Sequence, residues 1–220
     1  MKTFRHSFTL FVLMLATLCC SAQSHSYVDL GLPSGTLWAD RNVGAASPED
    51  YGDYFAWGET TTKSDYSWST YKYANGANDK LTKYCSRSDY GNNGYTDSRT
   101  TLERSDDAAY QNWGSQWCMP TQEQFQELKD KCTWKWTTRN GKNGYQVTGP
   151  NGNTIFLPAA GCRAGTYLNY DGSDGGYWSS SLGTDGSTGG RNLYFNSGVV
   201  NPDGWSLRRS GFSVRPVRCR

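Results

Sequence analysis

Short apolar stretches separated by long polar ones run along the chain, and their spacing predicts a few short helices. The clearest helix begins at Thr121, which forms a capping-box pair with Gln124 ahead of Phe125 and Leu128. These two apolar residues lie three positions apart, as on one helix face. The Ser-Pro pair at 47–48, followed by two acids, predicts a second short helix, because a hydroxyl cap and a proline in the first turn favour a helix start.

Strands are predicted where apolar residues alternate with polar ones or stand in short runs between turn residues. These segments are 27–42 (a pair of strands), 134–136, 145–148, 154–157, 177–178, 193–195 and 212–217. The sequence Gly-Pro-Asn-Gly at 149–152 predicts a hairpin turn. Helices come early and strands late, so we expect an α+β fold in one domain, residues 23–220. The polar segment 60–100 is too long for an ordinary connection, and is interpreted as a functional loop region, a partly disordered segment or a solvated insertion.

The N-terminus predicts export from the cytoplasm. A basic start, an apolar stretch over 8–18 and small residues up to Ala22 are typical of a signal peptide, residues 1–22. The apolar stretch is about half as long as a bilayer span requires. The alternative is a lipoprotein anchored through Cys19 or Cys20. We therefore expect a secreted, periplasmic or cell-surface protein without a transmembrane segment.

Net charge and histidine content argue against two classes of function, nucleic-acid binding and histidine-dependent catalysis. Two of the 22 basic residues leave with the signal peptide, so 20 basic residues face 20 acidic ones, and nothing provides the basic field that nucleic acid requires. His25 is the one histidine after residue 22, close to the new N-terminus, where we expect it to be mobile. Catalytic sites that need a fixed imidazole are therefore not expected. The prediction is a protein without catalysis, cofactor or metal.

Acidic residues leave one weaker alternative, a glycan-acting enzyme. Such an enzyme needs paired carboxylates, one of them in a buried site that raises its pKa. The late acids stand in Gly/Ser-rich segments, which indicates solvated side chains; examples are Asp171, Asp174, Asp185 and Asp203. The triplet 201–203 supplies too few oxygens for calcium and is interpreted as a turn. The acid pair Asp106-Asp107 is interpreted as a helix start rather than a metal site.

Five cysteines remain after the signal peptide: Cys85, Cys118, Cys132, Cys162 and Cys219. A bridge between Cys118 and Cys132 is excluded, because some ten helical residues between them advance about 15 Å and bridged Cα atoms lie within about 7 Å. Cys132 is predicted to be a buried free thiol. Three pairings of the other four are possible. We favour Cys162 with Cys219 and Cys85 with Cys118.

Ordered blocks of sequence resemble a known family, the Fibrobacter succinogenes major paralogous domain family. They are VDLGLPSGTLW (28–38), YGDYFAWGE (51–59), DDAA (106–109), WG (113–114), WCMPT (117–121), LPAAG (157–161), YWSS (177–180) and GFSVRPV (211–217). The resemblance implies a C-type-lectin-like fold, with short helices around a twisted antiparallel sheet, long loops and neighbouring chain ends. It implies no function. Cys118 and Cys162 depart from the usual family pattern.

The last third also resembles the variable proteins of diversity-generating retroelements. Segments 167–176, 184–192 and 201–209 are rich in Tyr, Asn, Ser, Asp, Gly and Arg, a mix that suits adaptable binding loops. We therefore expect a binding module whose late loops, 165–210, contact an unknown protein or glycan at the cell exterior. The predicted contact residues are Tyr167, Tyr170, Asp171, Asp174, Arg191, Asn196, Asp203, Trp205 and Arg208. The alternatives are plain polar loops on a structural or adhesin-like surface component without a discrete ligand.

Overall fold

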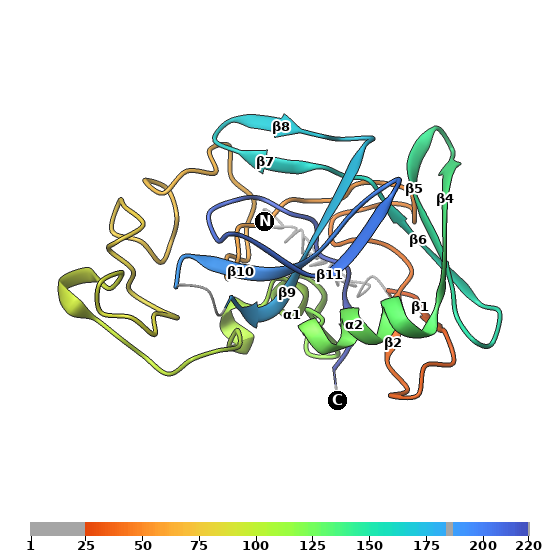
Figure 1. The fold of residues 1–220 in the computed structure, drawn as a ribbon, viewed down its shortest axis with the longest axis horizontal. Coiled ribbons are helices and arrows are strands. Elements are labelled where there is room, and N and C mark those ends of the chain that lie inside the picture. The colour runs from red at the N-terminus through yellow and green to blue at the C-terminus, as the bar shows by residue number, and fades with distance from the viewer. Residues whose placement is uncertain (1–24, 184–186, 220) are drawn as a thin grey trace, which may run out of the picture.

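Antiparallel strands form most of the regular secondary structure, and two α-helices pack against them (Figure 1). The computed structural model describes residues 25–183 and 187–219. The predicted signal peptide, Cys19, Cys20 and Asp185 lie outside these residues. No helix in the described part of the chain has the length and apolar character to cross a bilayer.

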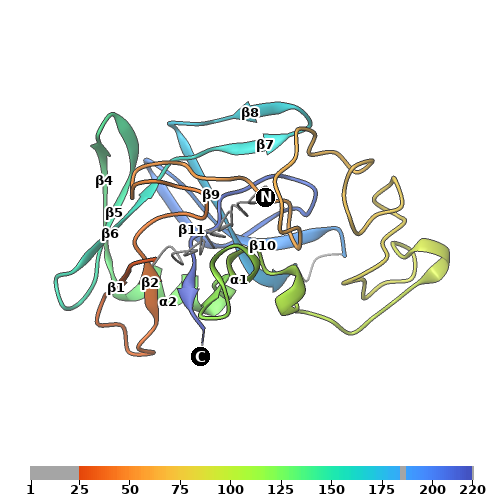
Figure 2. The same ribbon diagram turned by 180° about the vertical axis from the view of Figure 1, so that it is seen from behind.

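A four-stranded sheet joins the two ends of the described chain. Its strands are β1 (Tyr27–Asp29), β2 (Leu37–Ala39), β12 (Val217–Arg218) and β3 (Trp117–Cys118), in the order β1-β2-β12-β3. The pair of strands predicted over 27–42 is confirmed. Figure 2 shows β1 and β2 near the C-terminal end, as expected for neighbouring chain ends.

Three further antiparallel sheets complete the fold. The central sheet has the order β11 (Val199–Leu207), β10 (Gly189–Asn196) and β9 (Asp174–Leu182). A second sheet contains β4 (Thr133–Arg139), β5 (Lys142–Thr148) and β6 (Thr154–Pro158), and confirms the predicted hairpin. The hairpin of β7 (Cys162–Ala164) and β8 (Tyr167–Asn169) lies at the top of Figure 1. The prediction of late loops is therefore wrong, since most of the described chain between 165 and 210 is strand.

Both α-helices begin directly after the capping residues that the sequence predicts. In α2 (Gln122–Lys131), Gln124 N donates to Thr121 Oγ1 over 3.3 Å, and Thr121 N donates to Gln124 Oε1 over 2.9 Å, which confirms the capping box. Asp107 caps α1 (Ala108–Trp113), as expected. Two short 3-10 helices are η1 (Asn92–Gly94) and η2 (Arg104–Asp106).

The helix predicted after Ser47 is wrong, because this segment forms a turn. Asp50 N donates to Ser47 O over 3.2 Å, and the Asp50 carboxylate accepts from Ser47 N over 2.9 Å. Gly52 has φ +70°, and a Cβ there would lie 2.3 Å from Val43 O. The backbone at Gly52 therefore does not continue a helix, and it lies close to Val43 O.

Two aromatic-rich cores lie on opposite faces of the central sheet. Neighbouring residues of β9 show this, because Trp178 belongs to one core and Tyr177 to the other. Helix α2 packs against the Tyr177 face of the sheet and buries Phe125 and Leu128, as predicted. On the other face, Trp178 Nε1 donates to Phe55 O over 2.8 Å, so the indole is buried without an unpaired donor.

The long segment 60–100 is packed against the Trp178 core and is not a solvated insertion (yellow, left in Figure 1). It lacks regular strands, yet Tyr66, Tyr71 and Tyr84 are buried. Their hydroxyls hold the segment in place: Tyr66 donates to Tyr54 O over 2.6 Å and Tyr71 to Trp57 O over 2.7 Å. Aromatic rings therefore replace aliphatic side chains as the anchors of an irregular chain.

Asp106, which follows the segment 60–100 in the sequence, also binds residues of that segment. Its buried carboxylate accepts hydrogen bonds from Tyr73 and Tyr84 and forms an ion pair with Lys83 over 2.6 Å. Burial alone raises the pKa of Asp106, but hydrogen bonds from Lys83 and the two tyrosines outweigh it and hold the pKa at about 2. The carboxylate therefore stays ionised and links the segment to the start of α1.

The structure contains a disulfide between Cys118 and Cys219, with a Cα–Cα distance of 5.3 Å. Both predicted bridges are wrong, because each of them used one of these two cysteines. The physical reason is sheet order: β12 pairs with β3, so Cys219 lies next to Cys118. Cys85, Cys132 and Cys162 are free thiols, so the exclusion of a bridge from Cys118 to Cys132 is confirmed. Cys132 is half-buried rather than buried.

Candidate functional site

The predicted contact residues do not form one surface: they lie on both faces of the central sheet, at the β7–β8 hairpin and in the protein interior. Arg191 and Trp205 stand directly opposite each other on β10 and β11, so their side chains share one face of the central sheet. Arg191 Nη1 lies 3.2 Å from Asp203 Oδ1 on the same face. These three residues form what we call the Trp205 platform.

The Trp205 ring rests on backbone that only glycine provides. A Cβ at Gly189 would lie 1.9 Å from the indole nitrogen, and one at Gly183 would lie 2.7 Å from the same ring. The indole therefore lies against the main chain of these two glycines, while 38% of the residue stays exposed. An aromatic ring held in this way presents a fixed apolar surface to solvent.

A second group lies on the opposite face of the sheet. Leu193 and Phe195 share the face of Arg191, so the alternate residues Tyr194 and Asn196 point the other way. Asn196 stands opposite Asp174 across β10 and β9. The two predicted contact residues Asn196 and Asp174 are therefore neighbours, but on the face away from Trp205.

Tyr194 links this second group and was not among the predicted contact residues. Its hydroxyl donates to Asp174 Oδ2 over 3.0 Å and accepts from Asn196 Nδ2 over 3.2 Å. Burial, together with the hydrogen bond to Asp174, raises the pKa of Tyr194. A period of two along 193–195 could have shown that Tyr194 points away from its two core neighbours.

The remaining predicted residues differ sharply in exposure. Tyr167 at the start of β8 and Tyr170 just after it are 72% and 66% exposed, and Asp171 is exposed beside Tyr170. Arg208 is completely buried, which makes its assignment as a contact residue wrong. Its Nη1 donates to Tyr84 O over 2.9 Å.

Arg208 is buried because aromatic residues distant in sequence enclose it. Its guanidinium carbon lies 5.6 Å from the ring centroids of both Trp57 and Tyr71. Such stacking is favourable for a delocalised cation. Arg208 therefore holds the irregular segment against the sheet and is not available to a ligand.

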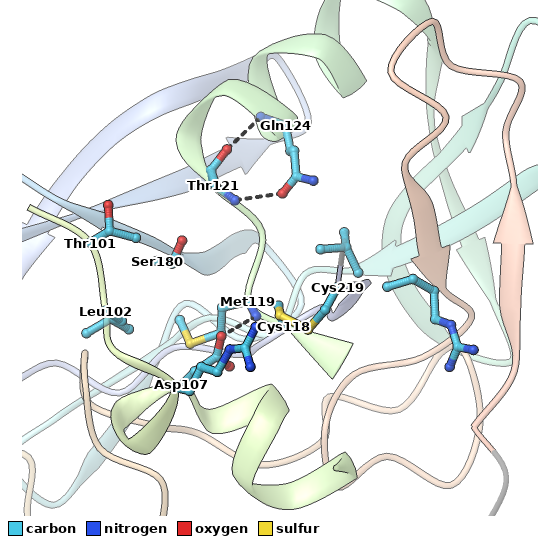
Figure 3. A pocket seen from close by; sticks show the side chains of 12 residues that line it. Thr101, Leu102, Asp107, Cys118, Met119, Thr121, Gln124, Ser180 and Cys219 are labelled. Atoms are coloured by element: carbon cyan, nitrogen blue, oxygen red, sulfur yellow. Dashed lines mark hydrogen bonds between the residues drawn. A yellow bond between two sulfur atoms is a disulfide. The ribbon is translucent and has the colours of Figure 1, made fainter. Parts of the chain in front are cut away.

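A small cavity of about 250 Å³ lies between the start of α2, the segment around Leu102 and the disulfide (Figure 3). Its one buried acid, Asp107, already accepts hydrogen bonds from Met119 N over 2.8 Å and Tyr110 N over 3.0 Å. Burial raises the pKa of Asp107. Figure 3 also shows Thr121 and Gln124 bonded to each other, so these polar groups serve the local fold.

The described residues contain no group of three or more histidine, cysteine or acidic side chains arranged to hold a metal ion. His25 is fixed rather than mobile, because its ring stacks on Trp113 with a centroid distance of 3.8 Å. Comparison of the chain with models of known protein families, with curated proteins and with solved structures finds no match. The geometry of the site itself is therefore the basis of a functional proposal.

Proposed function

We propose that the chain is a secreted or surface-displayed binding module without catalysis, with a C-type-lectin-like fold of the major paralogous domain type. Several features support this proposal. The fold is α+β with antiparallel sheets, and its first and last described strands share one sheet. The disulfide suits an oxidising compartment outside the cytoplasm. The ordered sequence blocks that resemble the family include much of the core framework.

The Trp205 platform is the observation that carries the proposal. Four of the five large apolar side chains exposed among the described residues lie between 167 and 205, and Trp205 is the one seated on glycine backbone. A fixed indole offers a large contact area and loses little conformational entropy when a ligand binds. The adjacent Arg191–Asp203 ion pair supplies polar contacts at the edge of the ring.

The position of Trp205 also favours binding over a purely structural role. Buried aromatic residues stabilise this fold on both faces of the central sheet. Trp205 belongs to neither core, and exposing an indole to water is unfavourable. A ligand that covers the ring would remove that cost, as aromatic anchors do in protein interfaces.

The test is binding of the purified exported protein to a panel of immobilised glycans and extracellular proteins. We expect Trp205→Ala to weaken any specific binding at least roughly tenfold, as expected for an anchor residue. The melting temperature should fall by no more than about 5 °C, because 38% of Trp205 is exposed and the residue belongs to neither core. Tyr27→Ala is the matched control, since Tyr27 is 50% exposed on β1, outside the platform.

Equal binding by the wild-type protein and Trp205→Ala would contradict the proposal. Turnover of a chromogenic glycoside that disappears in Asp203→Asn would instead favour the glycan-acting enzyme. If the wild-type protein captures no member of the panel, the structural alternative without a discrete ligand is favoured.

A further inference from the structure

A polar cavity of about 560 Å³ lies away from the Trp205 platform and includes none of the predicted contact residues. Three segments form it: the turn at 52–54, the start of the irregular segment at 62–66, and strand β7 with Arg163. Neither the sequence patterns nor the proposed binding face uses this cavity. Its walls and its charges both indicate a binding site.

The walls are held by hydrogen bonds and do not depend on a ligand. Tyr54 OH donates to Ala160 O over 2.6 Å, and Tyr66 OH donates to Tyr54 O over 2.6 Å. Tyr66 N donates to Gly165 O over 2.8 Å, which ties the segment 62–66 to the β7–β8 hairpin. The cavity is therefore a preformed feature of the fold.

The half-buried residue Arg163 brings a guanidinium to this cavity. Its guanidinium carbon lies 5.1 Å from the centroid of the Tyr54 ring, which fixes the side chain. Within 25–183 and 187–219, the guanidinium forms no hydrogen bond and no ion pair. Lys63 on the same cavity differs, because its Nζ is bound to Glu59 and Thr70 O over 2.9 and 3.2 Å.

Asp53 supplies the opposite charge at the rim. The backbone places it, because Asp53 N donates to Val43 O over 2.8 Å. Its carboxylate lies against Gly44, where a Cβ would come within 2.3 Å of Oδ2. No residue of the described chain donates a side-chain hydrogen bond to this carboxylate, and no salt bridge joins it to Arg163. Among the residues that the structure describes, the cavity therefore presents one cation and one anion without an ion-pair partner.

We propose that this cavity binds a small carboxylate whose neighbouring ammonium or hydroxyl group donates to Asp53. A guanidinium has a planar fork of donors that matches both oxygens of a carboxylate, and such pairs are among the strongest protein hydrogen bonds. The side-chain hydroxyls of Thr62 and Ser64 can bond to the rest of the ligand. Two sources have this chemistry: an α-amino acid and a uronic acid.

The test is calorimetric titration of the full exported protein with L-alanine, D-glucuronate and acetate. We expect saturable binding of alanine or glucuronate, and the one that binds identifies the source. Acetate should bind at least roughly tenfold more weakly, because it cannot donate to Asp53. Arg163→Gln should weaken binding at least roughly tenfold, since the bidentate pair is lost. Asp53→Asn should weaken the binding of alanine or glucuronate, which contact both Arg163 and Asp53, and should leave acetate binding unchanged.

Two control variants test whether any loss of affinity is specific to this cavity. Arg87→Gln removes an exposed arginine that forms an ion pair with its neighbour Asp89 and does not line the cavity, so it should leave affinity unchanged. Trp205→Ala should also leave affinity unchanged, which separates this site from the platform. The proposal is overturned if neither probe binds the wild-type protein up to about 10 mM. It is equally overturned if folded Arg163→Gln binds as the wild-type protein does; if that variant does not fold, unchanged probe binding by Asp53→Asn overturns it.

Discussion

Removing the Cys118–Cys219 disulfide tests how the two ends of the chain are held together. The bridge closes a loop with a sequence separation of 101, for which the chain-entropy model gives a stabilisation of about 4.7 kcal/mol. The double variant Cys118→Ala/Cys219→Ala also weakens β12, a strand of two residues that pairs with β2 and β3. We therefore expect the free energy of unfolding to fall by about 3–5 kcal/mol.

Urea unfolding followed by tryptophan fluorescence measures this loss, and a thermal melt should show a midpoint lower by roughly 6–20 °C. Cys162→Ser is the matched control, because it would break the bridge expected from sequence but touches only a free thiol here. Peptide mapping without reduction should yield a peptide that joins Cys118 to Cys219. A Cys162–Cys219 peptide, or an equal loss in Cys162→Ser, would refute the strand order described for the first sheet.

Two further predictions concern buried charges. The pKa of Asp106 is held at about 2, below its value of about 3.8 in an unfolded chain, so its contribution to stability is fully present above about pH 4 and is lost as pH falls towards 2. Asp106→Asn should remove that part of the acid unfolding transition, measured by circular dichroism, and an unchanged transition would contradict the role of its Lys83 partner. Arg208→Ala should lower the free energy of unfolding by about 2–4 kcal/mol, because packing and buried hydrogen bonds are lost, and exposed Arg87→Ala by less than about 1 kcal/mol. Equal losses in urea titrations would mean that Arg208 is solvated.

Local features of the fold could be predicted because their causes are local. The capping box at Thr121 is set by two side chains three positions apart, and the helix it begins is confirmed. The hairpin of β5 and β6 follows from alternation around a glycine turn. The helix predicted after Ser47 is absent for a non-local reason, since Gly52 adopts φ +70° and lies close to Val43 O.

Strand order could not be predicted, and the cysteine pairing failed with it. Strand β12 has only two residues, and nothing in its own sequence distinguishes β2 and β3 from β6 as neighbours. The geometric exclusion of a Cys118–Cys132 bridge succeeded because a helix has a fixed rise per residue. Distances along one regular element can be calculated from sequence, whereas distances between elements depend on the packing of the whole chain.

The exposure of individual residues in the candidate binding segment could not be predicted from sequence either. Trp205 and Arg208 are three residues apart in a segment whose composition is typical of binding loops, yet one is exposed and the other buried. The rings of Trp57 and Tyr71 make the difference, because they enclose Arg208 from a distant part of the chain. Composition therefore identifies a segment rich in contact residues but does not assign its members to a face.

The predicted contact residues on β10 also lie on two different faces of the sheet. Arg191 and Asn196 were expected on one contact surface, but Arg191 stands opposite Trp205 and Asn196 opposite Asp174, five positions apart on β10 and on opposite faces. One rigid ligand that covers Trp205 and Arg191 therefore cannot also reach Asn196 and Asp174 through the sheet. Substitutions on the two faces should act independently, and a loss of binding on changing Asn196 would require a second ligand or one that wraps around the edge of the sheet.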